Sequence, residues 1–147
     1  MFSLWAFLTI VHVVGLCLGV GSATVKVLLL VKSYRNVDFL PAWFKVVKPI
    51  TGLLLAGFAL ATLSGIGWLL LGYGFTNLLI LKLILVGIVW LTGPVIDNVF
   101  EPRFHQLAPA PGAEASVAFI RIQKQHFAIE VFATLLFYII LVIGILL

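Results

Sequence analysis

The sequence predicts an all-α integral membrane protein, a four-helix bundle that forms a single transmembrane domain over residues 1–147. Four long apolar runs predict it first, because each reaches the roughly 20 residues that a helix needs to cross a hydrocarbon core of about 30 Å. The composition agrees, with 63% hydrophobic and 10% charged residues, far from the balance of soluble proteins. Backbone groups in lipid must also be hydrogen-bonded within their own segment, which favours helices. The lipid bilayer is therefore the main expected partner.

The boundaries of the spans follow from the residues that interrupt the apolar runs. Pro49 is expected to begin the second span, because proline is tolerated in the first turn of a helix. Gly72 and Gly74 predict a tight turn that makes the second and third spans antiparallel neighbours. Pro94 predicts a kink at the end of the third span. The four spans are predicted at about 2–31, 46–71, 76–97 and 125–147.

Basic residues gather in two long connections, at 32–48 and 98–125, whereas the turn at 72–75 has none. The excess of Lys and Arg predicts that both connections are cytoplasmic and that both termini lie outside, in an inner (plasma) membrane. The Pro-rich segment 108–112 is expected to break the second connection, with a helix restarting near Ala113. These basic residues are placed for lipid headgroups, so the net charge of +4 implies no nucleic-acid partner.

Small residues recur at four-residue spacing in the first two spans, which predicts faces where helix backbones approach closely. The two stripes are Gly15, Gly19 and Ala23, and Gly57, Ala61 and Gly65. Aromatic residues near the ends of spans are expected to anchor at the membrane interfaces. They are Trp5, Trp43, Trp68 and Tyr73.

His12 and Lys82 are ionisable residues that lie within the first and third apolar runs, on the side of the outer ends of these spans. His12 is about 15 Å in from the outer end of the first span, and Lys82 about 9 Å in from that of the third. His12 could bind haem iron or another metal, relay a proton, or hydrogen-bond a neighbouring carbonyl. Lys82 could extend its amine to the outer surface, or point inward near His12 to serve an anionic substrate or a proton path. The pair is the main predicted site, because ionisable residues in membrane spans are costly.

A second group of ionisable residues lies toward the cytoplasmic side. Lys26 and Glu130 are expected to pair across facing helices, with Asp97 at similar depth and His126 four residues from Glu130. The group is interpreted either as a structural ion-pair network or as an entry path for protons or cations, with Lys26 also a candidate for binding a haem propionate. Three nearby residues, Glu101, Arg103 and His105, are expected to be solvated in a loop.

Spacing and composition exclude several kinds of site. His126 lies about 31 Å from the outer end of its span, roughly twice the depth of His12, so one chain cannot bind a single haem through both. Cys17 is the only cysteine, which excludes an intrachain disulfide and a thiolate metal cage. No metalloprotease, phosphate-binding, hydrolase or dinucleotide motif occurs.

Two stretches resemble a known group of membrane proteins. Residues 7–15, Phe-Leu-Thr-Ile-Val-His-Val-Val-Gly, look like the histidine-bearing first helix of the HemJ-type protoporphyrinogen oxidases and CopD-type copper-resistance proteins. Residues 81–86, Leu-Lys-Leu-Ile-Leu-Val, look like the lysine-containing third helix of that group, and Pro102-Arg103-Phe104 resembles its basic exit. The resemblance implies a bundle that binds haem b, with His12 as the haem ligand and Lys82 as an active-site group of an oxidoreductase.

The leading hypothesis is therefore binding of haem b or a porphyrin at His12, with Lys82 as the catalytic residue, for redox or tetrapyrrole chemistry. A second hypothesis is a non-enzymatic transporter of copper, protons or a small solute, whose path would run from Lys26, Asp97 and Glu130 toward His12. A third is a structural accessory subunit. A homodimer, or a place in a larger membrane complex, would supply ligands that one chain lacks.

Overall fold

The computed structural model describes residues 3–110 and 112–147, and within them the chain is helical with no β-strand. Three residues lie outside the described part of the chain. They are Met1 and Phe2, near the predicted start of the first span, and Pro111, in the predicted break. The helical elements are α1 (Leu4–Arg35), a 3₁₀ turn η1 (Val37–Phe39), α2 (Leu40–Leu70), α3 (Asn77–Val95), a π-helical turn η2 (Ile96–Phe100), α4 (Glu101–Leu107) and α5 (Val117–Leu146). The predicted all-α fold class is confirmed.

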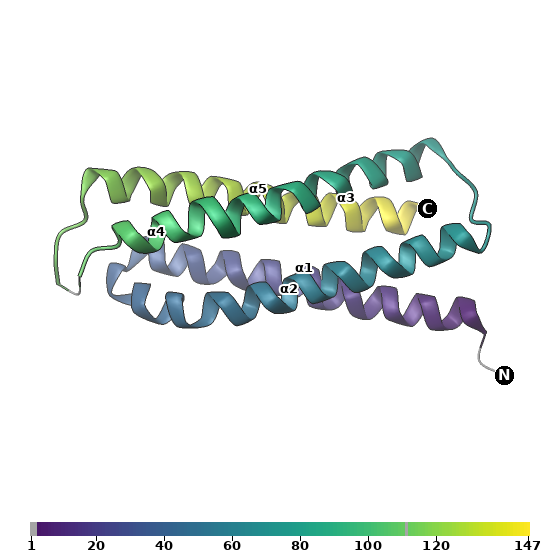
Figure 1. The fold of residues 1–147 in the computed structure, drawn as a ribbon, viewed down its shortest axis with the longest axis horizontal. Helices are drawn as coiled ribbons and strands as arrows, with labels where there is room; N and C mark the ends of the chain where they lie inside the picture. The colour runs from purple at the N-terminus through teal and green to yellow at the C-terminus, as the bar shows by residue number, and fades with distance from the viewer. Residues whose placement is uncertain (1–2, 111) are drawn as a thin grey trace.

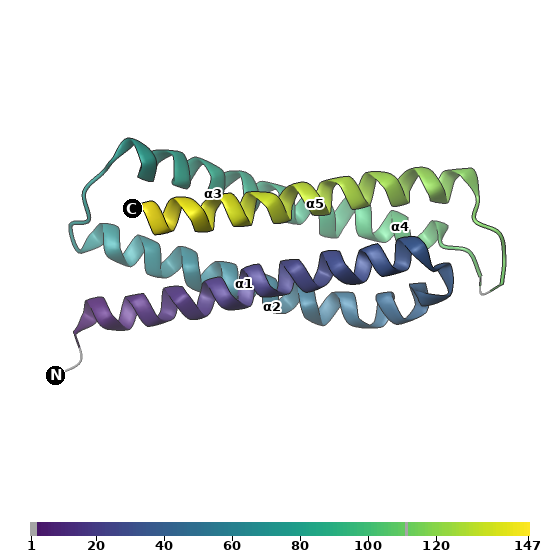
Figure 2. The same ribbon diagram turned by 180° about the vertical axis from the view of Figure 1, so that it is seen from behind.

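Four helical segments are long and apolar enough to cross a membrane, which makes the chain a multi-pass membrane protein. They run side by side along the length of the molecule (Figures 1 and 2). The connections at 36–39 and 108–116 lie at one end, called here the basic end, and the connection at 71–76 lies at the other, called the turn end. The start of α1 and the end of α5 both lie at the turn end (Figure 1). Large apolar side chains such as Leu63 on α2 and Leu91 on α3 are exposed, as expected of surfaces that face lipid.

The helix boundaries differ from the prediction at three places. The first connection occupies only residues 36–39, so α2 starts at Leu40 and Pro49 lies inside the helix. Pro41 occupies the first turn of α2 instead, where its missing N–H costs no helical hydrogen bond. The last helix restarts at Val117 rather than near Ala113, because Ser116 caps it by accepting a hydrogen bond from the Phe119 N–H.

The third helical run does not end near Asp97, where the third span was predicted to end. The backbone continues from α3 through the π-helical turn into α4, so the helical run reaches Leu107. A π-turn directly after a proline is consistent with the local loss of the regular hydrogen-bond ladder. As a consequence Asp97 and Glu101, four residues apart, both lie on helical backbone.

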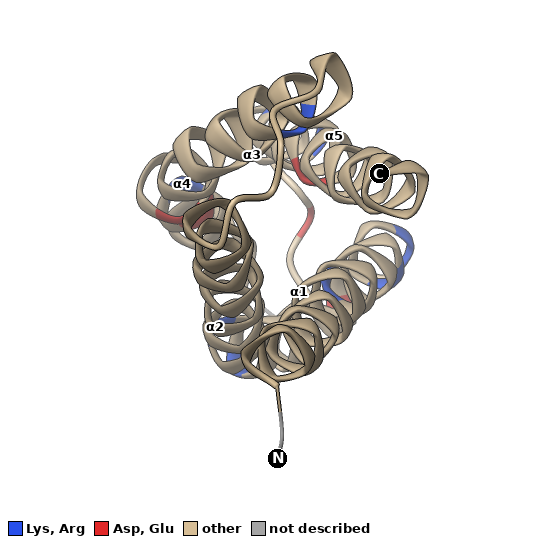
Figure 3. Ribbon diagram, turned by 90° about the vertical axis from the view of Figure 1, so that its right-hand side faces the viewer, with Lys and Arg blue, Asp and Glu red and all other residues tan. Residues whose placement is uncertain are grey.

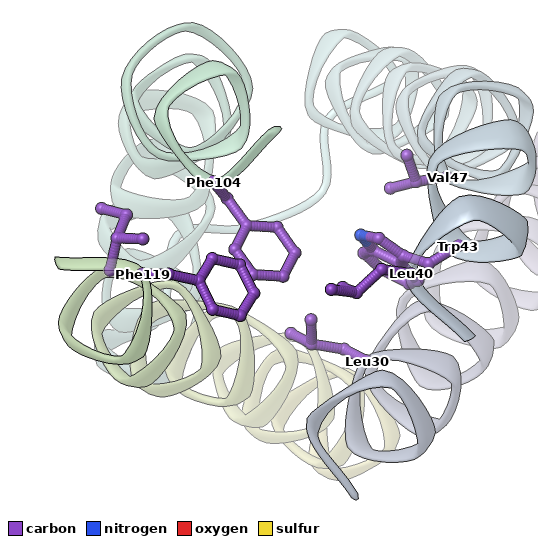
Figure 4. Close-up of a cluster of buried hydrophobic side chains, with 7 residues drawn as sticks. Leu30, Leu40, Trp43, Val47, Phe104 and Phe119 are labelled. Carbon is purple, nitrogen blue, oxygen red and sulfur yellow. The ribbon is translucent and has the colours of Figure 1, made fainter. Parts of the chain in front are cut away.

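The four long helices surround a common axis (Figure 3). α1 packs mainly on α2, and α3 packs on α5, whereas α2 and α3 run antiparallel but have few direct contacts. At the basic end a buried apolar cluster joins the two pairs (Figure 4). Phe104 and Phe119 stack there with ring centroids 5.3 Å apart. Trp43 belongs to the same cluster and is fully buried, so its predicted role as an interface anchor is wrong.

Candidate functional site

The closest approach of α1 and α2 positions the first predicted site residue. A Cβ atom added at Gly15 would lie 2.6 Å from the Ala61 nitrogen and 2.7 Å from the Gly57 carbonyl oxygen. Only glycine at position 15 therefore allows these backbones to meet, and the two predicted small-residue stripes face each other here. His12, three residues before Gly15, is thereby directed toward α2.

His12 is bound to α2 by one hydrogen bond. Its Nδ1 lies 2.9 Å from the Ser64 hydroxyl oxygen. The Ser64 hydroxyl donates its own proton to backbone carbonyls of the preceding turn, 2.8 Å from the Leu60 oxygen and 3.0 Å from the Ala61 oxygen. When the hydroxyl donates to one of these carbonyls, it accepts from an Nδ1–H, and a neutral His12 then carries its lone pair on Nε2. No hydrogen bond to Nε2 occurs within the described residues, so this atom is available for a ligand.

Trp68 completes the surroundings of the imidazole. Its ring centroid lies 4.7 Å from that of His12, with the ring planes tilted by 43°. Gly65, between Ser64 and Trp68, leaves ordinary van der Waals space beside the imidazole, since a Cβ added there would lie 3.9 Å from His12 Cε1. Two consecutive turns of α2 thus orient one side chain of α1.

His12 lines a cavity of about 410 Å³ in the turn-end half of the bundle. We call it the turn-end cavity. α1, α2, α3 and α5 all contribute to its lining, which is mostly apolar and includes Leu16, Leu69, Leu83 and Ile140. Lys82 lines the same cavity, so the structure brings the two predicted residues His12 and Lys82 to one place.

The Lys82 amine lies against the backbone of α5. A Cβ added at Gly144 would lie 2.9 Å from Lys82 Nζ, so the absence of a side chain at Gly144 makes room for the amine. Among the residues that the structure describes, no carboxylate lies within 4.0 Å of this amine. A half-buried ammonium without an acidic partner is suited to an anionic ligand.

The second predicted group comes together in the basic-end half. Lys26 Nζ lies 2.7 Å from Glu130 Oε1, and both residues are buried, with 2% and 4% of their surfaces exposed. Asp97 Oδ1 lies 3.7 Å from the same amine. His126 Nε2 lies 3.4 Å from Glu130 Oε1 and is fully buried against the ring of Phe104. Lys26, Asp97 and Glu130 line a second cavity of about 220 Å³, called here the basic-end cavity.

Glu101 belongs to this group, contrary to its prediction as a solvated loop residue. Its Oε2 lies 3.8 Å from Lys26 Nζ. The prediction was wrong because it ended the helix at Asp97, whereas the continuous helical run holds Glu101 beside the same amine. Arg103 and His105, predicted with it, are exposed, although they lie on α4 rather than in a loop.

His12 and His126 occupy different parts of the bundle, since His12 lines the turn-end cavity and His126 joins the group around Lys26. Within residues 3–110 and 112–147, no set of three or more His, Cys, Asp or Glu side chains is placed to hold a metal ion. A metal-containing group bound in the turn-end cavity would therefore have His12 as its one ligand among the His, Cys, Asp and Glu side chains of the cavity lining.

Ser64 was not singled out from the sequence, and Trp68 was predicted only as an interface anchor, not as a neighbour of His12. A signal was present, because both follow Ala61 at helical spacing and so extend the face of α2 that the small-residue stripe marks. Comparison with protein-family models, with curated proteins and with solved structures gave no match. The function proposed below therefore rests on the geometry of this chain and on the sequence resemblance described above.

Proposed function

We propose that this four-span membrane protein binds haem b, or a related porphyrin, in the turn-end cavity with His12 as an axial ligand. The observation that carries the proposal is the hydrogen bond between His12 Nδ1 and Ser64, which leaves Nε2 as the nitrogen available to a ligand in the cavity. Histidines that bind metals in proteins are held in this way, with the distal nitrogen hydrogen-bonded to a fixed acceptor. An imidazole that only satisfied its own polarity would have no need of a free second nitrogen beside a cavity.

The cavity suits a large flat apolar ligand. Its volume of about 410 Å³ falls within the roughly 300–1,000 Å³ of small-molecule sites. Its lining is mainly aliphatic and aromatic, with Trp68 beside the imidazole. Ile66 and Leu83 line the cavity and are also exposed, so it opens on the side that faces lipid. A hydrophobic tetrapyrrole could enter from the bilayer by this route.

Lys82 would bind the anionic edge of such a ligand. Its amine lies in the same cavity and has no acidic partner within 4.0 Å in the described part of the chain. Lys26, the other lysine considered for a propionate, lies near three carboxylates and lines the other cavity. Lys82 is therefore the better placed of the two amines to pair with a propionate.

The roles of the protein residues follow from these positions. When bound, haem would supply one-electron redox chemistry, which amino-acid side chains do not provide. His12 would bind the iron, Ser64 would fix the orientation and tautomer of His12, and Trp68 would exclude water from the imidazole. The surrounding apolar side chains would lower the local polarity, a factor that sets the potential of haem proteins.

The absorption spectrum of the detergent-purified protein tests the proposal. The full chain is expressed with haem supplementation, and spectra are recorded in the oxidised and dithionite-reduced states. The matched variants are His12→Ala and His105→Ala, since His105 is an exposed histidine at the basic end. We expect a Soret band in the wild type and in His105→Ala, and its loss in His12→Ala.

A colourless wild type that also fails to take up added haem or porphyrin would overturn the proposal. A Soret band that persists unchanged in a folded His12→Ala variant would remove His12 as the ligand. In either case the second hypothesis, transport of protons or a small solute, becomes the one to pursue.

A further inference from the structure

We infer that the basic-end cavity is a proton-binding site, in which the carboxyl groups of Asp97, Glu101 and Glu130 share at least one exchangeable proton at neutral pH. The inference does not depend on haem binding, because it rests on a different cavity and on different residues.

The count of charges around Lys26 carries the first step. Three carboxylates lie within 4.0 Å of one ammonium. The only other group in the cluster that can become positive is His126, beside Glu130. α2 contributes no charged side chain to the cavity. Even with His126 protonated, two positive charges face three negative ones, so a neutral cluster requires a protonated carboxyl.

Burial makes that neutrality necessary. Lys26, Glu130 and His126 are almost completely buried in a bundle whose outer surface faces lipid. An uncompensated charge in such a place is unfavourable, and titratable groups then change their protonation instead. Asp97 and Glu101 are less buried, with 28% and 19% of their side chains exposed, so they form the edge through which a proton can exchange.

Unpartnered polar groups point independently to a bound proton or water. The hydroxyl oxygen of Thr51, a residue that lines the same cavity, is buried and has no hydrogen-bond partner within the described residues. The side chains of His126 and Gln123 each retain a buried nitrogen without a hydrogen-bond partner. Buried polar groups are seldom left unpaired. Thr51 lines the cavity and His126 lies beside Glu130, so these two groups are placed to stabilise either protonation state of the carboxyl groups.

The central ammonium decides between a proton and a metal cation. A Na⁺ ion bound by these three carboxylates would lie close to Lys26 Nζ, which is 2.7 to 3.8 Å from one oxygen of each. Two positive charges at such a distance repel each other strongly in a poorly polar interior. A proton on a carboxyl group adds no such repulsion, because it neutralises the oxygen to which it is attached.

Apolar side chains separate this site from its surroundings along the bundle axis. Toward the turn end, Phe58 and Phe137 line both cavities, with ring centroids 5.1 Å apart. Toward the basic end, the buried cluster of Figure 4 covers the group, and Phe104 of that cluster contacts His126. Protons therefore enter and leave the cluster through its partly exposed members, Asp97 and Glu101. Phe58 and Phe137 separate the cluster from the turn-end cavity, where His12 and Lys82 lie.

Infrared spectroscopy of the full chain reconstituted in liposomes tests the inference. The sequence has only five acidic residues, and the two outside the cluster, Asp38 and Glu114, are exposed. The Glu114→Gln control below accounts for a contribution from an exposed acid. We expect a carbonyl stretching band of protonated carboxylic acid at pH 7 that shifts in D₂O and disappears as the pH is raised.

The variants assign the band. Asp97→Asn, Glu101→Gln and Glu130→Gln are made singly and together, and Glu114→Gln is the matched control. We expect loss of the band in the triple variant, loss or a shift in at least one single variant, and no change in Glu114→Gln. The single variants keep the test decisive if the triple variant does not fold. A wild type without the band at pH 7, or a band unchanged in every cluster variant, would overturn the inference.

Discussion

The Ser64 hydroxyl on α2 accepts a hydrogen bond from His12 Nδ1 on α1, 2.9 Å away, beside the point where the two helices approach most closely. Ser64 is itself fixed by donating to its own helix backbone, so it cannot rotate freely to donate to the imidazole. One serine thereby determines which nitrogen of His12 can act as a ligand or a base.

Replacing Ser64 with alanine is expected to weaken haem binding by about 10–100-fold, the usual effect of losing the partner that orients a metal-binding histidine. Thr9→Ala is the matched control, because Thr9 lines the same cavity but bonds only to the Trp5 carbonyl. Haem titration followed by the Soret band measures both affinities. Equal affinities for the two variants would show that the hydrogen bond from His12 has no role in ligand binding.

Gly144→Ala is expected to displace the Lys82 amine without harming the fold. The new methyl group would meet only the flexible end of Lys82, and alanine stabilises a helix by about 0.5–1 kcal/mol relative to glycine. Porphyrin affinity should fall in Gly144→Ala and in Lys82→Met. It should remain unchanged in Gly87→Ala, where an added Cβ meets nothing within 4 Å. Titration with a dicarboxylic porphyrin and with its dimethyl ester provides the readout. A loss confined to the free acid indicates ion pairing with Lys82, whereas equal loss for both ligands would contradict it.

Gly15→Ala is expected to destabilise the protein by about 1–3 kcal/mol, the usual cost of overpacking a tight contact. The added methyl group would meet backbone atoms of α2, which cannot rotate away as a side chain can. Gly21→Ala, on the same helix, meets nothing within 4 Å and should be neutral or slightly stabilising. Thermal unfolding in detergent compares the two. If Gly15→Ala were as stable as Gly21→Ala, the close crossing of α1 and α2 would be wrong.

Lys26→Met is expected to cost about 3–5 kcal/mol of stability, because it leaves a group of buried carboxyl groups without their ammonium. The loss should become smaller as the pH falls. In the variant, ionised carboxylates destabilise the folded state, and protonation removes their charge, so folding is favoured at lower pH. Lys45→Met, at an exposed lysine, should change stability by no more than about 0.5 kcal/mol. Urea unfolding over a range of pH tests both the size and the pH dependence. A loss independent of pH would argue against ionised acids as its cause.

Phe58→Ala is expected to join the two cavities and to increase passive proton flux across proteoliposomes several-fold. The flux should fall again when Glu130→Gln is added, because protons would then lack one of their binding groups. Phe132→Ala, at an exposed phenylalanine of α5, is the control and should leave the flux at the wild-type level. A pH-sensitive dye inside the vesicles reports the rate. If Phe58→Ala prevents folding, Phe58→Leu provides a smaller opening. A folded variant with unchanged flux would show that Phe58 is not the barrier.

Much of the fold could be predicted from the sequence, because membrane helices must satisfy their own backbone and reveal themselves by length and hydropathy. The stripes containing Gly15 and Gly57 also indicated which faces of α1 and α2 meet. Helix ends were harder to predict. Pro49 suggested the start of the second span, yet α2 begins at Leu40. The third span was predicted to end at Asp97, yet the helical run continues past it to Leu107. A proline removes one hydrogen bond, and packing around it determines whether the helix ends or bends.

The site was harder to predict than the fold. The sequence indicated His12 and Lys82 because ionisable residues are conspicuous among apolar ones. It could not show that Ser64 faces His12, since the two are 52 positions apart and only the crossing of α1 with α2 brings them together. Glu101 was missed for a related reason, because its position depends on the π-helical turn between Asp97 and α4.

Phe58 and Phe137 line both cavities, so a change in the rotamer of either ring alters two compartments at once. A ligand that moved these rings on one side would change the free energy of protonation on the other. By thermodynamic reciprocity, protonation would then alter the affinity of the ligand by the same factor. The shared pair of aromatic rings thus provides the structural element for cooperativity between two binding events that use different ionisable side chains.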